Sequence, residues 1–132
     1  MMYPRMFILF NHSLTEAQRD DAKKNLGVGS FVTPPPELSA AWSQLPPDAP
    51  SLALVLAPVF QWLEREAHAG DYLLVQGDFG ATFLLAQKAF SLGLTPLYST
   101  TRREATEEKD GDTVRIVHHF CHVRFRNYEV LP

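Results

Sequence analysis

Three short polar segments hold the side chains of this chain that are best suited to chemistry. They are the Asn-His-Ser triplet at 11–13, the Gly- and Asp-containing stretch at 76–82, and the Ser-Thr-Thr-Arg-Arg run at 99–103. Together they offer hydroxyls, amides, one imidazole and two guanidinium groups. Guanidinium groups bind phosphate in a bidentate manner, and small residues allow the backbone to approach a ligand closely. We therefore expect a phosphate-bearing ligand.

Within these segments, two kinds of residue are candidates for catalysis. His12 is the first candidate for proton transfer, because an imidazole titrates near neutral pH. A histidine at the end of a strand is also often only a hydrogen-bonding neighbour, so that alternative stays open. Arg102 or Arg103 is expected to stabilise the charge that develops on a reacting phosphate. The expected ligand-binding residues are Asn11, Ser13, Thr15, Gln76, Gly77, Asp78, Gly80, Ala81, Thr82, Ser99, Thr100 and Thr101.

Neither a metal ion nor a cofactor is expected. The chain has a single cysteine, Cys121, and His118 and His119 project to opposite faces of a predicted strand. His118 and His122 lie about 13 Å apart at the rise of a strand, too far to share one ion. His119 or His122 lines the ligand pocket only if this strand borders it, and packing is the simpler role.

The central polar segment connects a predicted strand to a predicted helix. Residues 72–75 are a short apolar run typical of a strand that is buried on both faces, and residues 83–92 favour a helix that Gly93 ends. Between them, Gly77 and Gly80 allow a tight turn, and Asp78 or Thr82 can cap the helix. The turn lacks the P-loop lysine and the three-glycine dinucleotide motif.

The remaining chain alternates predicted strands and helices. Thr15 and Gln18 form a capping box at the start of a helix that Gly27 ends. In the helix at 51–67, Pro58 predicts a kink or a break, and Trp62 lies off the main apolar stripe. We predict strands at 6–10, 29–32, 94–98 and 113–125, helices at 15–26, 37–45 and 51–67, and a tight turn at Asp110-Gly111.

If strands 6–10, 72–75 and 94–98 run parallel, their carboxyl ends meet at one edge of the sheet. The three polar segments would then converge there, where ligands bind in open α/β sheets. In the last strand, regular alternation places His119 on one face with Val117, Cys121, Val123 and Phe125. The opposite face then carries Ile116, His118, Phe120, His122, Arg124 and Arg126.

The composition indicates one globular domain over residues 1–132, and the alternation of predicted strands and helices makes its class α/β. The chain is 45% hydrophobic and 20% charged, with a net charge of −3, which gives no electrostatic footprint for duplex nucleic acid. No apolar run is long enough for a signal peptide or a membrane span. A soluble, cytoplasmic protein with no membrane partner is the expected class.

The chain resembles the small stand-alone CRISPR-associated proteins related to CARF domains, in particular the short ones regarded as ring nucleases. The resemblance implies a Rossmann-like CARF-type fold: a mainly parallel sheet flanked by helices, with a C-terminal β-hairpin. It also implies a homodimer that binds cyclic oligoadenylate across its twofold axis. The resemblance rests on residues 11–15, 70–71, 75–82, 98–103 and 122–125.

From this resemblance we expect a ring nuclease that cuts a cyclic oligoadenylate, most simply cyclic tetra-adenylate, to linear products and so switches off antiviral signalling. Metal-independent RNA cleavage uses a ribose 2′-hydroxyl that attacks the neighbouring phosphate in line. Two alternatives remain: a non-catalytic sensor or sponge for the same ligand, and a protein that uses the fold for assembly alone. A dinucleotide enzyme is disfavoured, because the glycine motif is missing.

Overall fold

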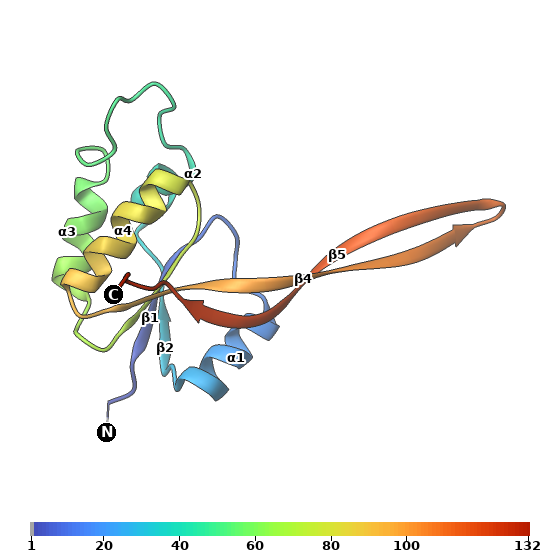
Figure 1. Cartoon of the computed structure of the whole chain (residues 1–132), viewed down its shortest axis with the longest axis horizontal. Coiled ribbons are helices and arrows are strands. Elements are labelled where there is room, and N and C mark those ends of the chain that lie inside the picture. The colour runs from blue at the N-terminus through green and yellow to red at the C-terminus, as the bar shows by residue number, and fades with distance from the viewer. Residues whose placement is uncertain (1) are drawn as a thin grey trace.

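A single mixed sheet of five strands organises the chain (Figure 1). The computed structural model describes residues 2–132. The strand order is β2-β1-β3-β4-β5, in which the first four strands are parallel and β5 runs antiparallel to β4. In chain order the elements are β1 (Arg5–Leu9), α1 (Glu16–Leu26), β2 (Ser30–Val32), α2 (Pro36–Ser43), α3 (Ala57–Glu66), β3 (Tyr72–Val75), α4 (Phe79–Ser91), β4 (Thr95–Asp110) and β5 (Thr113–Asn127).

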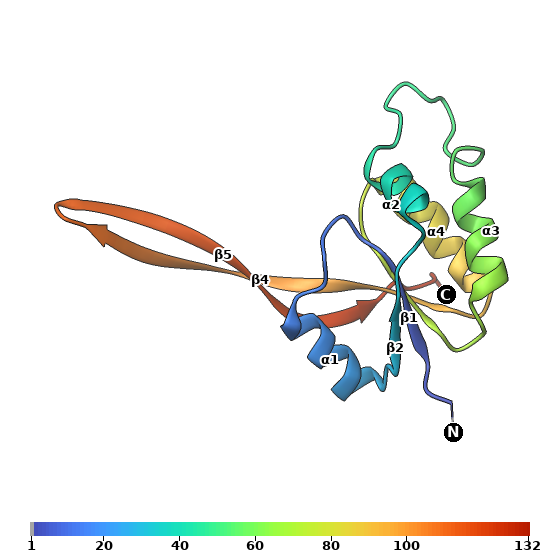
Figure 2. The ribbon, with the colours of Figure 1, turned by 180° about the vertical axis from the view of Figure 1, so that it is seen from behind.

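Helices cover both faces of the sheet, as the continuous apolar runs of its central strands predict. Alternate residues of β1 enter different cores, with Phe7 and Leu9 on one face and Met6 and Ile8 on the other. Helix α1 packs on the second face, and α2, α3 and α4 pack on the first (Figure 2). None of the helices within residues 2–132 has the length and apolar character needed to cross a membrane.

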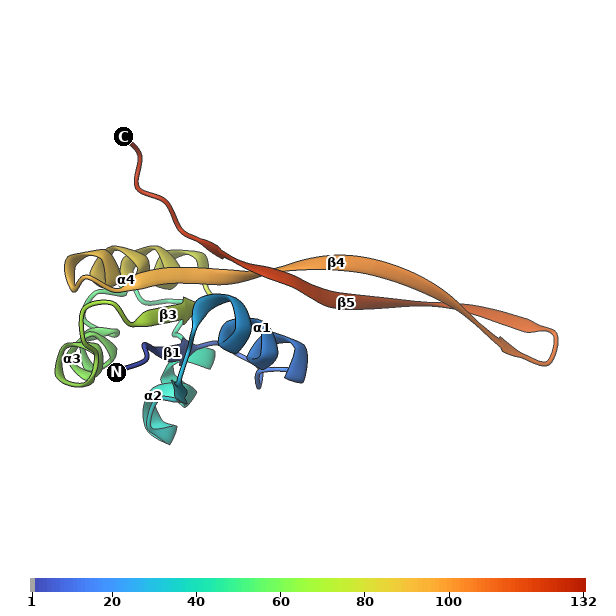
Figure 3. The same ribbon diagram turned by 90° about the horizontal axis from the view of Figure 1, so that it is seen from below.

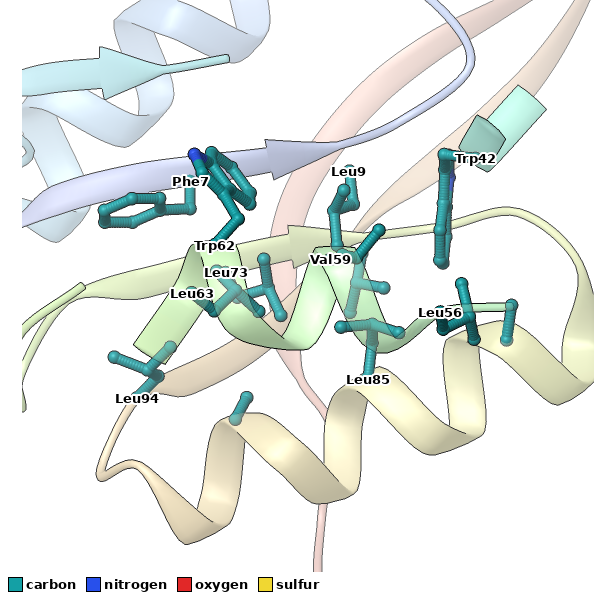
Figure 4. Close-up of a cluster of buried hydrophobic side chains, with 13 residues drawn as sticks. Phe7, Leu9, Trp42, Leu56, Val59, Trp62, Leu63, Leu73, Leu85 and Leu94 are labelled. Carbon is teal, nitrogen blue, oxygen red and sulfur yellow. The ribbon is translucent and has the colours of Figure 1, made fainter. Parts of the chain in front are cut away.

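The larger core lies between the sheet and helices α2, α3 and α4 (Figure 4). Trp62 is buried there, and its ring meets that of Phe7 edge-on at 5.4 Å between centroids. The prediction that Trp62 lies outside the packed stripe was therefore wrong. The predicted stripe assumes a helix that is too long: residue 52 forms a bend, residues 53–56 form turns, and α3 begins only at Ala57.

Prolines and caps set the starts of the helices. Pro58 occupies the first turn of α3, where a missing N–H costs no hydrogen bond, so it begins the helix instead of kinking it. The capping box of Thr15 and Gln18 forms as predicted, and Gly27 ends α1 in the left-handed conformation. Helix α4 starts four residues earlier than predicted, because the Asp78 side chain accepts a hydrogen bond from the Ala81 N–H.

The largest departure from the sequence prediction is the length of β4. This strand does not end at 98 but continues to Asp110, and β5 returns alongside it from Thr113. The outer part of this hairpin, residues 101–121, projects far from the body of the molecule (Figure 3). We call this part the arm. The predicted turn at Asp110-Gly111 is present, with Gly111 at a φ of 62°.

The β4–β5 pairing contains one bulge. Thr100 pairs with Arg124, but Thr101 pairs with His122, so Val123 is an extra residue on β5. The bulge reverses the alternation that the sequence predicted, and it places His122 and Phe125 on the same face. Their rings are 4.6 Å apart. The Thr100 side chain satisfies the backbone carbonyl and the backbone N–H of Arg124. Its hydroxyl donates a hydrogen bond to the carbonyl at 3.0 Å and accepts one from the N–H at 3.2 Å.

Candidate functional site

The carboxyl ends of β1 and β3 lie at one edge of the sheet, level with residues 97–99 of β4, so the three predicted strand ends do meet, although β4 itself runs on to Asp110. Leu9 is level with Val75, and Leu74 is level with Leu97. The segments that follow these strands therefore start at the same edge. The Ser99 N–H donates to the side-chain oxygen of Gln76 at 2.8 Å, which joins the second and third polar segments directly.

A cavity of about 330 Å³ lies beside the end of β1. Asn11, His12 and Ser13 line it, together with Arg19 from α1. The Arg19 guanidinium lies over the ring of Phe31, 5.0 Å from its centre. No carboxylate within residues 2–132 forms a salt bridge with this arginine. The cavity thus combines an exposed imidazole with an unneutralised positive charge.

Trp42 lines this cavity and Gln76 lines a second one, so the contact between the two residues forms the wall between the cavities. The Trp42 indole N–H donates to the backbone carbonyl of Gln76 at 3.2 Å. A Cβ atom at Gly77 would lie 2.9 Å from the same nitrogen. Because Gly77 is not among the residues with positive φ, its small size matters here and not its backbone freedom. This corrects the prediction that Gly77 and Gly80 serve a tight turn, since Gly80 lies inside α4.

The second cavity, of about 290 Å³, is lined by aromatic rings beside the carboxyl end of β3 and the inner part of β4. The rings of Tyr98 and Tyr128 are 4.8 Å apart, and the Tyr128 hydroxyl donates to the Val75 carbonyl at 2.7 Å. Burial and the neighbouring Tyr98 raise the pKa of Tyr128. Phe79 completes the lining and is 94% exposed. Arg126 reaches this cavity through Tyr98, to whose hydroxyl it donates at 3.1 Å.

Several predicted ligand-binding residues have structural roles. Thr15 and Asp78 use their side-chain oxygens to cap helices. Gly80 and Ala81 lie in the first turn of α4, where Ala81 is fully buried. Thr82 lines the second cavity, although its hydroxyl is buried and has no hydrogen-bond partner within the described residues.

The third polar segment divides into two parts. Ser99 and Thr100 stay at the edge of the sheet, but Thr101, Arg102 and Arg103 belong to the exposed arm. At about 3.3 Å per residue, Arg102 is about 10 Å beyond Ser99. The expectation that 99–103 forms a loop at the site was therefore wrong. Exposed polar residues resembled a loop, but pairing with β5 makes them a strand.

A buried chain of polar side chains links α1 to the hairpin. Ser99 Oγ lies 2.6 Å from His122 Nδ1, and His122 Nε2 lies 2.6 Å from Asp21 Oδ2. Gln18 donates to Ser99 Oγ at 3.3 Å. The order serine, histidine, aspartate is that of a hydrolase triad, but Ser99 is only 7% exposed. These hydrogen-bonded side chains therefore hold β4 and β5 on α1 and do not present a nucleophile.

Asp21 is charged within this chain of side chains. Burial raises its pKa, but hydrogen bonds from Asn25 and His122, together with the charge of His122, outweigh burial and hold the pKa below its usual value of 3.8. No sequence pattern indicates this partnership, because Asp21 and His122 are 101 positions apart and Asp21 reads as part of a solvated helix face.

The sequence matches the family described as the uncharacterized protein MJ1673 family over residues 4–126. The chain belongs to this family. Uncharacterized protein MJ1673 of Methanocaldococcus jannaschii is 46% identical over 126 residues, which cover 95% of this chain and 97% of that relative. No solved structure matches the sequence.

The stretch that matches the MJ1673 family begins just before β1 and ends at Arg126. It includes the first cavity, the buried side-chain network and the whole arm, and it leaves out Tyr128 of the second cavity. Within residues 2–132 no three His, Cys, Asp or Glu side chains are grouped so that they could hold a metal ion.

Sequence reasoning missed the two arginines that the fold brings to the edge. Arg19 reads as part of a solvated helix face, and Arg126 as a strand residue far from the glycine-containing turn. Only the tertiary structure places one beside each cavity. Phe79 is the signal that the sequence does carry, since an aromatic residue directly follows the Gly77-Asp78 turn at the expected ligand edge.

Proposed function

We propose that the protein is a ring nuclease that binds a cyclic oligoadenylate along the carboxyl edge of its sheet and cleaves it to linear products. The observation that carries the proposal is the pair of adjacent cavities on either side of Gln76 and Trp42, one polar and basic, the other aromatic. A cyclic oligonucleotide carries phosphates, which suit the basic cavity, and bases, which suit the aromatic one, and the two alternate around its ring.

The aromatic cavity suits a nucleobase. Phe79 and Tyr98 offer ring faces, and stacking of a base on an aromatic side chain contributes about 1–3 kcal/mol to binding. An adenine held there places its ribose and phosphate at the sheet edge. The Phe79 ring is free for this role because it takes no part in either core.

Positive charge on both sides suits the phosphates of the ring. Arg19 borders the first cavity, and Arg126 stacks on Tyr98 at the second, 5.6 Å from the ring centre. Planar guanidinium groups bind phosphate oxygens in pairs, and the N-terminal end of α4 adds a favourable dipole. These charges serve the ligand locally, although the whole chain carries a net charge of −3.

In the proposed reaction a ribose 2′-hydroxyl attacks the adjacent phosphorus. The bond from phosphorus to the 5′-oxygen breaks, and the products are a 2′,3′-cyclic phosphate and a 5′-hydroxyl. This chemistry requires alignment, proton transfer and charge stabilisation but no metal. His12 is the candidate for proton transfer, and Arg19 takes the charge-stabilising role that the sequence assigned to Arg102 or Arg103.

The CARF-like resemblance supports the same function at the level of the whole molecule. Four parallel strands with helices on both faces are compatible with a Rossmann-like CARF-type fold. In this proposal the protein is a cytoplasmic homodimer that ends type III CRISPR antiviral signalling by removing its second messenger.

A second candidate is a sensor or sponge that binds the ring without cutting it. The position of Arg102 and Arg103 on the arm favours this alternative. It leaves the ligand-binding edge of the sheet with fewer positively charged groups to stabilise a reacting phosphate than the sequence predicted. The two functions share a ligand and differ in turnover.

The deciding experiment incubates the protein with an excess of radiolabelled cyclic tetra-adenylate. We expect linear products over many turnovers, and we expect His12→Ala to lower the rate by about 10²–10⁴-fold with little loss of binding. His68→Ala is the matched control, because His68 is exposed and lines a cavity at the opposite end of the sheet. Tight retention without product identifies the sponge, and absence of binding refutes both functions.

Phe79→Ala tests the nucleobase cavity separately. We expect binding of cyclic tetra-adenylate to weaken by about 1–3 kcal/mol, measured by filter binding or calorimetry. Phe83→Ala is the control, because Phe83 is also exposed on α4 but lies outside the second cavity. Equal affinities of both variants and the wild type would show that no base stacks on Phe79.

A further inference from the structure

The arm is a two-stranded ribbon that lacks a covering layer. Residues 101–116 and 118–120 are all exposed, and the ribbon projects into solvent (Figure 3). An isolated two-stranded hairpin is at best marginally stable in water. A ribbon of this length therefore calls for a partner, and its two faces show which side the partner covers.

The polar side chains on the two faces of the arm differ in whether they find ion-pair or hydrogen-bond partners within the arm. On the polar face, Arg115 pairs with Glu108 at 2.5 Å, and Thr106 meets His119 at 3.2 Å. On the other face, Arg103, Glu107 and Lys109 form no ion pair within residues 2–132. From the strand register, this apolar face consists of Arg103, Ala105, Glu107 and Lys109 on β4 and of Val114, Ile116, His118 and Phe120 on β5.

The apolar face exposes large side chains in a row. Phe120 is 71% exposed and Ile116 is 59% exposed, with His118 between them. Beside this row, alternate residues of β4 lie on the same face: Arg103, Ala105, Glu107 and Lys109. A partner must offer apolar side chains to one strand and opposite charges to the other.

We propose that the partner is a second copy of the chain, whose arm packs antiparallel on this face about a twofold axis through Ala105 and His118. The axis places Arg103 of each copy against Glu107 of the other, and Phe120 of each against Ile116 of the other. Both contacts occur twice, as in every isologous interface. Ala105 has the smallest side chain on this face, which permits close approach at the axis.

The pattern also selects the direction of packing. If the arms lay parallel about a twofold axis, β4 of one copy would cover β5 of the other. Arg103 would then lie over Phe120, and Glu107 over Ile116, burying unpaired charges against apolar side chains. The antiparallel arrangement places apolar on apolar and positive on negative.

Helix α1 limits how far the arms overlap. The face continues inward to His122, whose side chain is 4% exposed because α1 covers it. In the proposed register, Val114 at the tip of one arm comes level with His122 of the other. The stretch of the apolar face that α1 leaves uncovered is therefore as long as the stretch over which the two arms overlap about the twofold axis. The tip of each arm ends against the body of its partner.

Substitution of one face tests the proposal without any ligand. We expect the wild type to be a dimer by light scattering over a range of concentrations. We expect Ile116→Asp to raise the dimer Kd by about 100-fold or more, because it buries an unpaired carboxylate. Val117→Asp is the matched control, since it adds the same charge on the polar face and should leave the dimer intact. A monomeric wild type, or equal effects of both variants, overturns the proposal.

Cross-linking tests the position of the axis. Facing sheets pack about 10 Å apart, beyond the reach of a disulfide, so a short bis-maleimide is the suitable reagent. In a Cys121→Ser background we expect Ala105→Cys to give a covalent dimer and Glu104→Cys, on the opposite face, to remain uncross-linked. Equal yields from both variants would exclude an axis at Ala105.

Discussion

At the scale of single residues, the polar groups of this protein are divided between cavities and buried joints. His12, Asn11 and Arg19 face a cavity, whereas Ser99, His122 and Asp21 are consumed in holding the hairpin against α1. The two sets contain similar chemistry and differ in exposure. A serine beside a histidine is therefore a sign of function only where a substrate can reach the hydroxyl.

Asp21→Asn tests the buried joint. Removing the carboxylate charge weakens the contact with His122, and we expect the free energy of unfolding at neutral pH to fall by about 1–3 kcal/mol. The folded pKa of Asp21 lies below its unfolded value of 3.8. Its stabilising effect is therefore present above pH 3.8 and is lost as the pH falls through the folded pKa.

Urea unfolding of wild type and variant across this pH range measures the effect. The difference in stability between the two proteins should shrink as the carboxylate is protonated. Asp20→Asn is the control, because Asp20 is the exposed neighbour on α1. A constant difference at every pH would mean that the charge of Asp21 is not what stabilises the joint.

At the scale of secondary-structure elements, the contact between α2 and the turn after β3 separates the two cavities. Gly77→Ala inserts a methyl group 2.9 Å from Nε1 of the buried Trp42 side chain, which is too close for both to keep their positions. We expect a loss of about 1–3 kcal/mol in stability and a change in tryptophan fluorescence as Trp42 is displaced.

Gly80→Ala is the control for this substitution. A Cβ at Gly80 meets its nearest atoms at 3.4 and 3.5 Å, an ordinary contact, and alanine favours the helix by up to about 1 kcal/mol. We expect thermal unfolding to show a neutral or stabilising effect. If Gly77→Ala were equally well tolerated, the wall between the cavities would be softer than its packing indicates.

The elements with strong local signals were predictable from the sequence. Buried runs such as β1 and β3, and the capped helix α1, agree with their predicted bounds within one or two residues. The outer half of β4 was not predictable, because its exposed Thr, Arg and Glu residues look like a loop unless the pairing with β5 is known. Topology placed the correct edge of the sheet, but Arg19, Arg126 and Tyr128 reach it only through tertiary packing.

At the scale of the whole molecule, the body and the arm are separate in their contacts. No residue of 101–121 belongs to either buried cluster. Joining Thr101 to His122 through an Asn-Gly turn, with 102–121 removed, keeps the joint to α1 and closes the hairpin where the two residues pair.

We expect this shortened protein to unfold with a free energy within about 0.5 kcal/mol of that of the wild-type monomer, as measured by chemical denaturation of the monomeric variant Ile116→Asp alongside it. We also expect it to be a monomer. A body that fails to fold without the arm would show that the ribbon stabilises its own chain and not only a neighbouring copy.

The extra residue at Val123 has a consequence for how such a chain can change. The pairing at this position determines which face of the ribbon each side chain farther out along β5 takes. An inserted residue that the bulge did not absorb would shift the pairing of the outer part of β5 by one position, so that Ile116 and Phe120 would turn away from the face that carries Arg103 and Glu107. Relatives that differ by one amino acid at this point could thus lose the ability to recognise one another while keeping identical interiors.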